Sequence, residues 1–143
     1  GYWGDMTRTY LKGKASDAQR RLVRTVKKAH QLAIETIKPG ISGGSVHQAV
    51  EDFFLKEGYE TTKGDDQPTG FFHALGHGIG LELHEQPIMR HGAKFRLRKG
   101  MAMAIEPGLY YPGLGGARFE DVVHVVSDGC QKISAAPYKW EIT

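Results

Sequence analysis

The sequence is poor in cysteine, since Cys130 is the single thiol among 143 residues. One cysteine excludes an internal disulfide framework and fits a reducing compartment, so we expect a cytoplasmic protein. Long apolar runs are also missing, because no stretch approaches the roughly 20 residues that cross a bilayer. The first ten residues lack the apolar core of a signal peptide. We therefore expect no association with a membrane.

Charge of one sign is not abundant either, and the net charge is +3. Basic residues gather between positions 8 and 28, as they would in a nucleic-acid-binding patch. Aromatic residues are not interleaved with them, and no nucleic-acid-binding motif is present. A solvated helix face explains the cluster better, so we expect no nucleic-acid partner.

Two helices are predicted in the first 60 residues. Ser16 and Gln19 match a capping box, after which apolar residues recur at helical spacing until Pro39 stops the helix. Ser45 and Gln48 match a second capping box and open a shorter amphipathic helix.

The remaining segments have the character of β-strands. Strands are expected at residues 1–11, 71–83, 101–106, 119–126 and 130–134. Turn-rich links are expected at residues 85–94 and 110–116. This order predicts a single α+β domain, in which a mostly antiparallel sheet has helices against one face.

Three histidines follow one another in the glycine-rich stretch 71–85, "FFHALGHGIGLELHE". His73 and His77 are four residues apart, but the glycines between and after them disfavour a helix. In an extended segment these two share one face, whereas His84 needs a bulge or turn to reach the same cavity. Each histidine alone would more often be structural.

Acidic residues elsewhere can supply further ligands. Glu106 precedes Pro107, which favours extended backbone, so its carboxylate is expected at a strand end. Alternation predicts that Arg118 and Glu120 share a face that excludes Asp121. The competing interpretations are a salt bridge at a sheet rim for Glu106 and an exposed ion pair for the other two.

Asp5 completes the set, and Thr7, on the same predicted face, could hydrogen-bond a carboxylate or a bound water. An aspartate after glycine is by itself more often a turn residue. One imidazole and three carboxylates together suit a divalent ion of the manganese, cobalt, iron or zinc group. Converging carboxylates repel one another without a cation, and the number of ligands suggests two ions.

Four blocks carry a family resemblance: "GYWGDMTRT", "HALGHGIGLELHEQP", "AIEPGLYYPG" and "GARFEDVVHV". In this order they resemble the signature blocks of the pita-bread metallopeptidases, from residue 1 to about residue 127. The third and fourth blocks look most like the proline-specific branch, which comprises aminopeptidase P and prolidase. The resemblance implies the C-terminal part of the pita-bread fold, with a curved, mostly antiparallel sheet.

The resemblance also implies roles for individual residues. It implies four metal ligands: Asp5, His77, Glu106 and Glu120. Glu106 is also expected to be the general base, while His73 and His84 contact the substrate and steady the tetrahedral intermediate. Arg118 is expected to support either the metal cluster or one end of the substrate. Two divalent ions are implied, with manganese or cobalt expected first and zinc or iron as alternatives.

Two parts of the family's pattern have no match in residues 1–143. One is a metal-binding aspartate, which the family supplies on the strand before the Asp5 block. The other is the first pseudo-symmetric half of the fold. We therefore expect residues 1–143 to be a partial catalytic domain of a longer protein. Alone, it is expected to form a homo-oligomer or to depend on the missing half, and to be weakly active or inactive.

The implied activity is removal of an N-terminal residue before proline from a peptide, by water that two metal ions activate. Alternatives are a methionine aminopeptidase, a creatinase-like hydrolase, or a peptidase-like protein-binding module without catalysis. The complete ligand set within this span favours catalysis over binding.

Overall fold

The computed structural model describes residues 1–64 and 67–142. Helix α1 spans Asp17–Thr36 and helix α2 spans Gly43–Lys56. The capping box before α1 is confirmed, because the Gln19 amide donates to Ser16 Oγ and the Ser16 amide donates to Gln19 Oε1, at 3.2 and 2.9 Å. Neither described helix combines the length and the apolar character that crossing a bilayer requires.

The second predicted capping box is wrong. Helix α2 is capped by Ser42, whose Oγ accepts a hydrogen bond from the amide of Ser45. The helix begins three residues early because Gly43 and Gly44 allow close contact with a distant loop. A Cβ on Gly44 would lie 2.5 Å from the carbonyl oxygen of Ala93.

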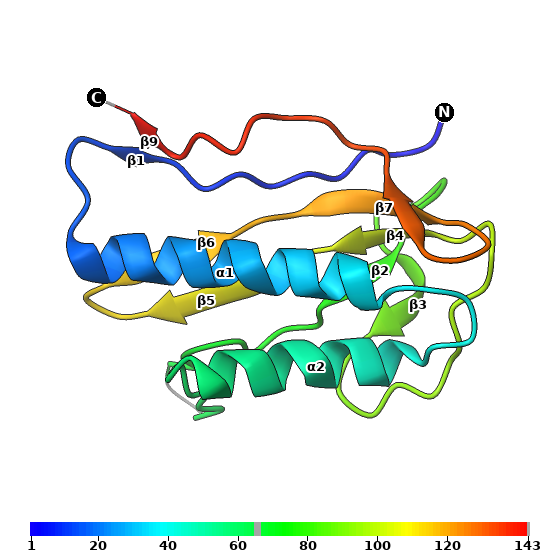
Figure 1. Cartoon of the computed structure of the whole chain (residues 1–143), viewed down its shortest axis with the longest axis horizontal. Coiled ribbons are helices and arrows are strands. Elements are labelled where there is room, and N and C mark those ends of the chain that lie inside the picture. Colours follow the sequence, from blue (N-terminus) through cyan, green and yellow to red (C-terminus); the bar gives the residue numbers. More distant parts are fainter. Residues whose placement is uncertain (65–66, 143) are drawn as a thin grey trace.

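Nine strands are described: β1 (Leu11–Lys12), β2 (Gly76–Gly78), β3 (Glu85–Met89), β4 (Ala102–Ile105), β5 (Gly108–Tyr111), β6 (Gly115–Arg118), β7 (Asp121–Val125), β8 (Cys130–Lys132) and β9 (Glu141–Ile142). Five of them form an antiparallel sheet in the order β3-β2-β4-β7-β8. Strands β5 and β6 form a hairpin, and β1 pairs with β9 in parallel. The α+β class and the mostly antiparallel sheet are confirmed (Figure 1).

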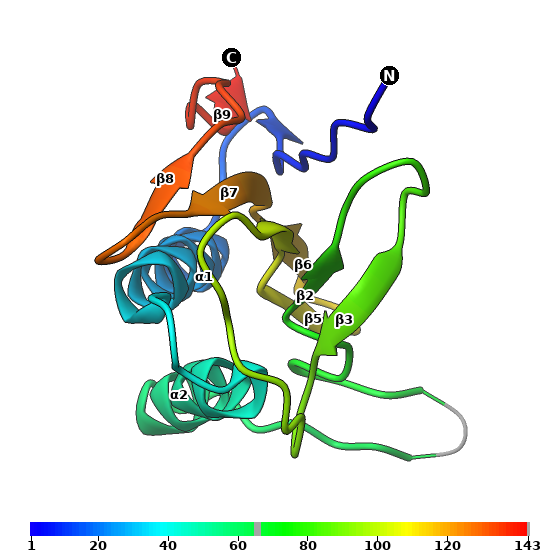
Figure 2. The ribbon, with the colours of Figure 1, turned by 90° about the vertical axis from the view of Figure 1, so that its right-hand side faces the viewer.

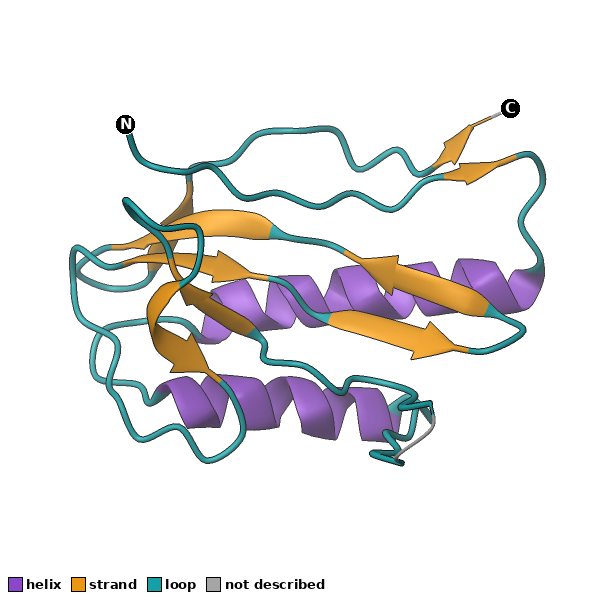
Figure 3. Ribbon diagram, turned by 180° about the vertical axis from the view of Figure 1, so that it is seen from behind, coloured by secondary structure: helices purple, strands orange, loops and turns teal. Residues whose placement is uncertain are grey.

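Both helices cover the same face of the sheet, as predicted (Figures 2 and 3). Apolar residues of α1 and α2 join buried strand residues in one core, with examples at Val26, Phe54, Met103 and Val123. The N-terminal segment runs beside the C-terminal segment, along the edge of the molecule nearest β7 (Figure 1). The core therefore fixes β2, β4 and β7, which bring the candidate ligands together.

Several predicted strands have different bounds. Of residues 1–11 only Leu11 lies in a strand, and the rest is held by isolated hydrogen bonds. The segment 71–83 contains only the three residues of β2 before the chain bends. The predicted strands 101–106, 119–126 and 130–134 shorten to β4, β7 and β8.

One strand, β3, lies wholly where a turn-rich link was predicted, at residues 85–94. Strand β3 contains Pro87, which has no N–H group to donate. An edge strand tolerates this residue because one side of the strand makes no ladder hydrogen bonds. The other predicted link, 110–116, holds the turn of the β5–β6 hairpin, where Gly113 and Gly115 adopt positive φ angles of 79° and 115°.

Candidate metal centre

His77 occupies the middle of β2, between β3 and β4. Its glycine neighbours permit close strand approach, since a Cβ on Gly76 would lie 2.0 Å from the Ala104 carbonyl oxygen. His77 Nδ1 lies 2.9 Å from the carbonyl oxygen of Gly78. Because a carbonyl only accepts, Nδ1 carries the proton and Nε2 keeps the free lone pair, as a metal ligand requires.

The turn needed by His84 is present. The β2–β3 register shifts between His77 and Gly78, and the chain then bends before β3. The imidazole rings of His77 and His84 therefore meet edge to face, with centroids 4.4 Å apart.

Glu106 lies directly after β4, at the expected strand end, where its amide donates to the Leu75 carbonyl oxygen at 2.8 Å. Its Oε1 is 3.6 Å from His77 Nε2, and Oδ2 of Asp5 is 3.5 Å from the same nitrogen. Ligand atoms of His77, Glu106 and Glu120 all lie within 4.8 Å of one another. Ligand atoms of Asp5, His77 and His84 form a second such group, so the four predicted ligands fall into two groups that share His77.

Thr7, two residues after Asp5, links the N-terminal segment to Glu120, which lies near the other end of the chain. The amide of Glu120 donates to the Thr7 carbonyl oxygen at 3.1 Å, and Thr7 Oγ1 donates to Glu120 Oε2 at 2.5 Å. The predicted hydrogen bond from Thr7 to a carboxylate is therefore confirmed. The amide of Trp3 donates to the Gly80 carbonyl oxygen at 2.9 Å, which holds the Asp5 segment against the histidine loop.

Burial and neighbouring carboxylates raise the pKa of two glutamates in this cluster, Glu106 and Glu120. Burial raises the pKa of Glu106 to about 7, with further upward contributions from Glu120 and Asp5 against a downward one from Arg118. Burial and the charge of Asp5 also raise the pKa of Glu120, although the Thr7 hydrogen bond opposes this. A divalent cation would remove this repulsion.

The donor set fits a divalent ion on independent grounds. The His77 side chain is only 4% exposed, and its Nε2 makes no hydrogen bond to any residue that the structure describes. Asp5 and Glu106 each place a carboxylate oxygen within 3.6 Å of that nitrogen. A buried imidazole lone pair facing carboxylate oxygens suits a borderline-hard metal ion.

A pocket of about 410 Å³ opens beside these ligands. His73, His84, Glu106 and Arg118 line it, as do Phe72, Ile88 and Tyr110, which our sequence analysis did not identify. His73 Nδ1 lies 2.8 Å from the Ala74 carbonyl oxygen, and its buried Nε2 has no hydrogen-bond partner among the described residues. The signal for Tyr110 was its place four residues after Glu106 in "EPGLY".

Alternation predicted that Arg118 and Glu120 share a face of one strand, but β6 ends at Arg118 and β7 begins at Asp121. The competing interpretation, an exposed ion pair of Arg118 with Glu120, is not found among the described residues. Arg118 Nη1 instead lies 3.2 Å from Glu106 Oε2, and its Nε donates to the Tyr110 hydroxyl at 2.8 Å. Asp121 lies outside the cluster, since its carboxylate accepts hydrogen bonds from Arg8, Ser134 and Tyr138.

Known proteins share this arrangement of elements. The chain is 40% identical over 129 residues to the Xaa-Pro dipeptidase of Lactobacillus helveticus, covering 90% of this chain and 33% of the relative. The structure of the Xaa-Pro dipeptidase from Bacillus anthracis superposes with a TM-score of 0.89 at 36% identity, covering 99% of this chain and 38% of that one. The prolidase from Pyrococcus horikoshii gives 0.85 at 34%, covering 95% and 37%.

The chain therefore spans 33–38% of the length of these relatives, and its fold corresponds to the C-terminal part of the prolidase pita-bread fold. The model of metallopeptidase family M24 matches residues 1–127, which include all the candidate ligands. On this match and these identities, the chain belongs to metallopeptidase family M24.

Proposed function

We propose that residues 1–143 are part of the catalytic domain of a metal-dependent peptidase that cleaves the bond before proline at the N-terminus of a peptide. The observation that carries the proposal is the convergence of Asp5, His77, Glu106 and Glu120 beside a pocket that contains two further histidines. The names of the relatives, Xaa-Pro dipeptidase and prolidase, support the substrate class.

Asp5, His77, Glu106 and Glu120 would hold two divalent ions, which we propose to be manganese or cobalt. When bound, such ions polarise a carbonyl group and lower the pKa of a water molecule. Carboxylates outnumber the imidazole three to one, which suits manganese better than a softer ion.

In this proposal Glu106 accepts a proton from the attacking water. Its carboxylate is fixed at the end of β4 and is 14% exposed, so it is held in one position yet reaches the pocket. Its pKa of about 7 lies close to neutral pH, where a general base works best, and bound cations would lower it. Arg118, 3.2 Å away, keeps the carboxylate oriented.

His73 and His84 provide the polar groups that would contact the peptide. His84 lies beside His77 and can donate a hydrogen bond to the oxygen on which negative charge develops. His73 presents a buried, unpartnered Nε2 within the described part of the chain. Phe72 and Tyr110, with ring centroids 5.3 Å apart, form an apolar wall suited to a proline ring.

Metal binding and peptide cleavage test the two halves of the proposal. Equilibrium dialysis of the chain against Mn²⁺ should show binding that His77→Ala and Glu120→Gln abolish. Asp128→Asn, in the exposed turn between β7 and β8, is the matched control and should bind normally. Absence of metal binding in the unsubstituted chain would refute the assignment.

Substrate choice is tested in a protein of the relatives' full length that carries residues 1–143, with Xaa-Pro, Met-Xaa and creatine as parallel substrates. Preferential hydrolysis of Xaa-Pro supports the proposal, whereas preference for Met-Xaa or creatine would replace it. Four ligand residues are few for two ions, so the isolated chain is expected to bind metal but to cleave weakly or not at all.

A further inference from the structure

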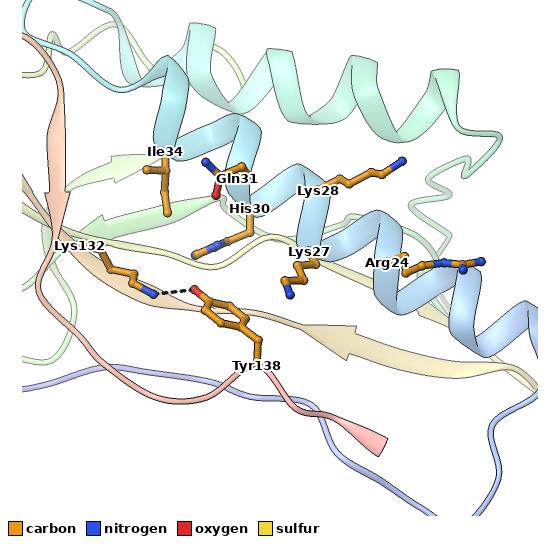
Figure 4. Close-up of a pocket in the computed structure, with 8 residues that line it drawn as sticks. All are labelled: Arg24, Lys27, Lys28, His30, Gln31, Ile34, Lys132 and Tyr138. Atoms are coloured by element: carbon orange, nitrogen blue, oxygen red, sulfur yellow. Dashed lines mark hydrogen bonds between the residues drawn. The ribbon is translucent and has the colours of Figure 1, made fainter. Parts of the chain in front are cut away.

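A second pocket, of about 520 Å³, lies between α1 and the segment that follows β8 (Figure 4). It shares no lining residue with the pocket at the metal centre. Four cationic residues line it, of which Lys27 and Lys132 lie nearest to Tyr138, whereas the ends of Arg24 and Lys28 point away from it (Figure 4). Ile34 and Tyr138 provide apolar wall, and none of the lining residues is acidic.

Two of the ammonium groups converge on one aromatic ring. Lys27 Nζ lies 4.9 Å and Lys132 Nζ lies 4.6 Å from the ring centroid of Tyr138. The two charges are therefore less than about 10 Å apart, close enough to repel at ordinary ionic strength. Cation–π contacts offset part of this repulsion but supply no negative charge.

The nearest carboxylate is already neutralised. Asp121 is fully buried, and Lys132 Nζ approaches its Oδ2 only to 3.7 Å. Arg8 lies closer, with its Nη2 2.8 Å from Asp121 Oδ1, and hydroxyl groups of Ser134 and Tyr138 also donate to this carboxylate. Within the described ranges, Arg24, Lys27 and Lys28 form no salt bridge. The pocket therefore carries an excess of positive charge.

A buried histidine lies at the base of this pocket. His30 is 2% exposed, and its ring points from α1 towards Lys132 (Figure 4). Its Nε2 makes no hydrogen bond to a described residue, and the nearest carboxylate oxygen, Oδ2 of Asp121, is 3.4 Å away. A buried polar atom without a partner is costly, and a ligand or water can satisfy it.

We propose that this pocket binds a small organic phosphate. Its phosphate group would be held by the ammonium groups of Lys27 and Lys132, and its organic part would pack against Ile34 and Tyr138. A phosphate dianion matches two converging ammonium groups better than a single carboxylate does. The apolar wall explains why an organic ester would bind more tightly than inorganic phosphate.

The test is a titration of the ¹⁵N-labelled chain with phenyl phosphate, inorganic phosphate and benzoate, at constant ionic strength. Phenyl phosphate should bind saturably, with shift changes concentrated on Gln31, Ile34 and Tyr138. Lys27→Gln and Lys132→Gln should each weaken its affinity about tenfold or more. The control is Lys56→Gln, at the exposed end of α2, which should leave affinity unchanged.

Three results would overturn the proposal. These are shift changes spread over the surface without saturation, equal weakening by Lys56→Gln, and benzoate binding as tightly as phenyl phosphate. The lysines concerned are exposed or partly exposed, so substitution should not unfold the chain, and the spectrum of each variant verifies this. Tight binding of phenyl phosphate with loss only in the Lys27 and Lys132 variants would support the site.

Discussion

The ion pair between Arg8 and Asp121 should be one of the strongest single contributions to stability. The two side chains are 4% and 0% exposed, and Arg8 Nη2 lies 2.8 Å from Asp121 Oδ1. Burial raises the pKa of Asp121, but hydrogen bonds from Arg8, Ser134 and Tyr138 outweigh this and hold the pKa below its ordinary value. Asp121 is therefore ionised near neutral pH, and Arg8 has a true counter-ion.

Asp121→Asn keeps the shape of the side chain and removes its charge. Arg8 would then be buried without a counter-ion, which costs about 3–5 kcal/mol. That is a large share of the 5–15 kcal/mol that typically stabilises a domain. Arg8 Nη1 also donates to the carbonyl oxygens of Thr7 and Glu120, at 2.9 and 2.8 Å. The variant should therefore also bind Mn²⁺ more weakly.

Urea denaturation followed by circular dichroism measures the loss, and a double-mutant cycle with Arg8→Met separates the pair from its surroundings. The sum of the losses in the two single variants should exceed the loss in the double variant by about 0.5–3 kcal/mol, because each single substitution removes the same interaction. The control is Glu141→Gln in the half-exposed pair with Arg20, which should destabilise far less. Strictly additive losses, or a loss below about 1 kcal/mol in Asp121→Asn, would refute the reasoning.

Three further predictions concern β2, the metal and His30. Gly76→Ala should destabilise the fold by about 1–3 kcal/mol or more and weaken Mn²⁺ binding, because the new Cβ meets the backbone of β4. Urea denaturation and equilibrium dialysis measure the two effects. The control for both is Gly64→Ala, whose new Cβ would have no atom within 4 Å. Mn²⁺ at about a hundred times its dissociation constant should raise the free energy of unfolding by about 2.7 kcal/mol, and should leave His77→Ala unchanged in the same denaturation assay. Burial lowers the pKa of His30 from 6.5 to about 4, so the unfolded chain binds this proton more readily between those values. The free energy of unfolding is then highest above pH 6.5 and falls towards pH 4, by at most about 3 kcal/mol. In His30→Gln the urea midpoint should change less with pH across this range.

Features set by neighbouring residues could be predicted from the sequence. The capping box of Ser16 and Gln19 needs only a spacing of three residues, and the position of Glu106 follows from Pro107. The bend that brings His84 to His77 follows from parity along an extended chain and from the glycines between them. These features depend on residues close together in the sequence, so distant tertiary contacts did not change them.

Features set by distant residues could not be predicted. The start of α2 depends on the contact of Gly43 with Phe95, where a Cβ would lie 2.2 Å from the ring. The partner of Arg118 depends on the strand break between β6 and β7, which turns the guanidinium towards Glu106. No local pattern in the amino-acid sequence predicts either of these two contacts.

The ligands differ in how rigidly the fold holds them, and this difference bears on metal affinity. His77 lies within the five-stranded sheet, and the amides of Glu106 and Glu120 bond to neighbouring backbone. Asp5 is carried by a segment outside any strand, and its side chain is 21% exposed, compared with 4% for His77. An ion held by His77, Glu106 and Glu120 therefore needs little ordering of the chain, whereas recruiting Asp5 costs conformational entropy. The hydrogen bonds of Trp3 and Thr7 reduce that cost, because they order the segment on both sides of Asp5 before any ion arrives.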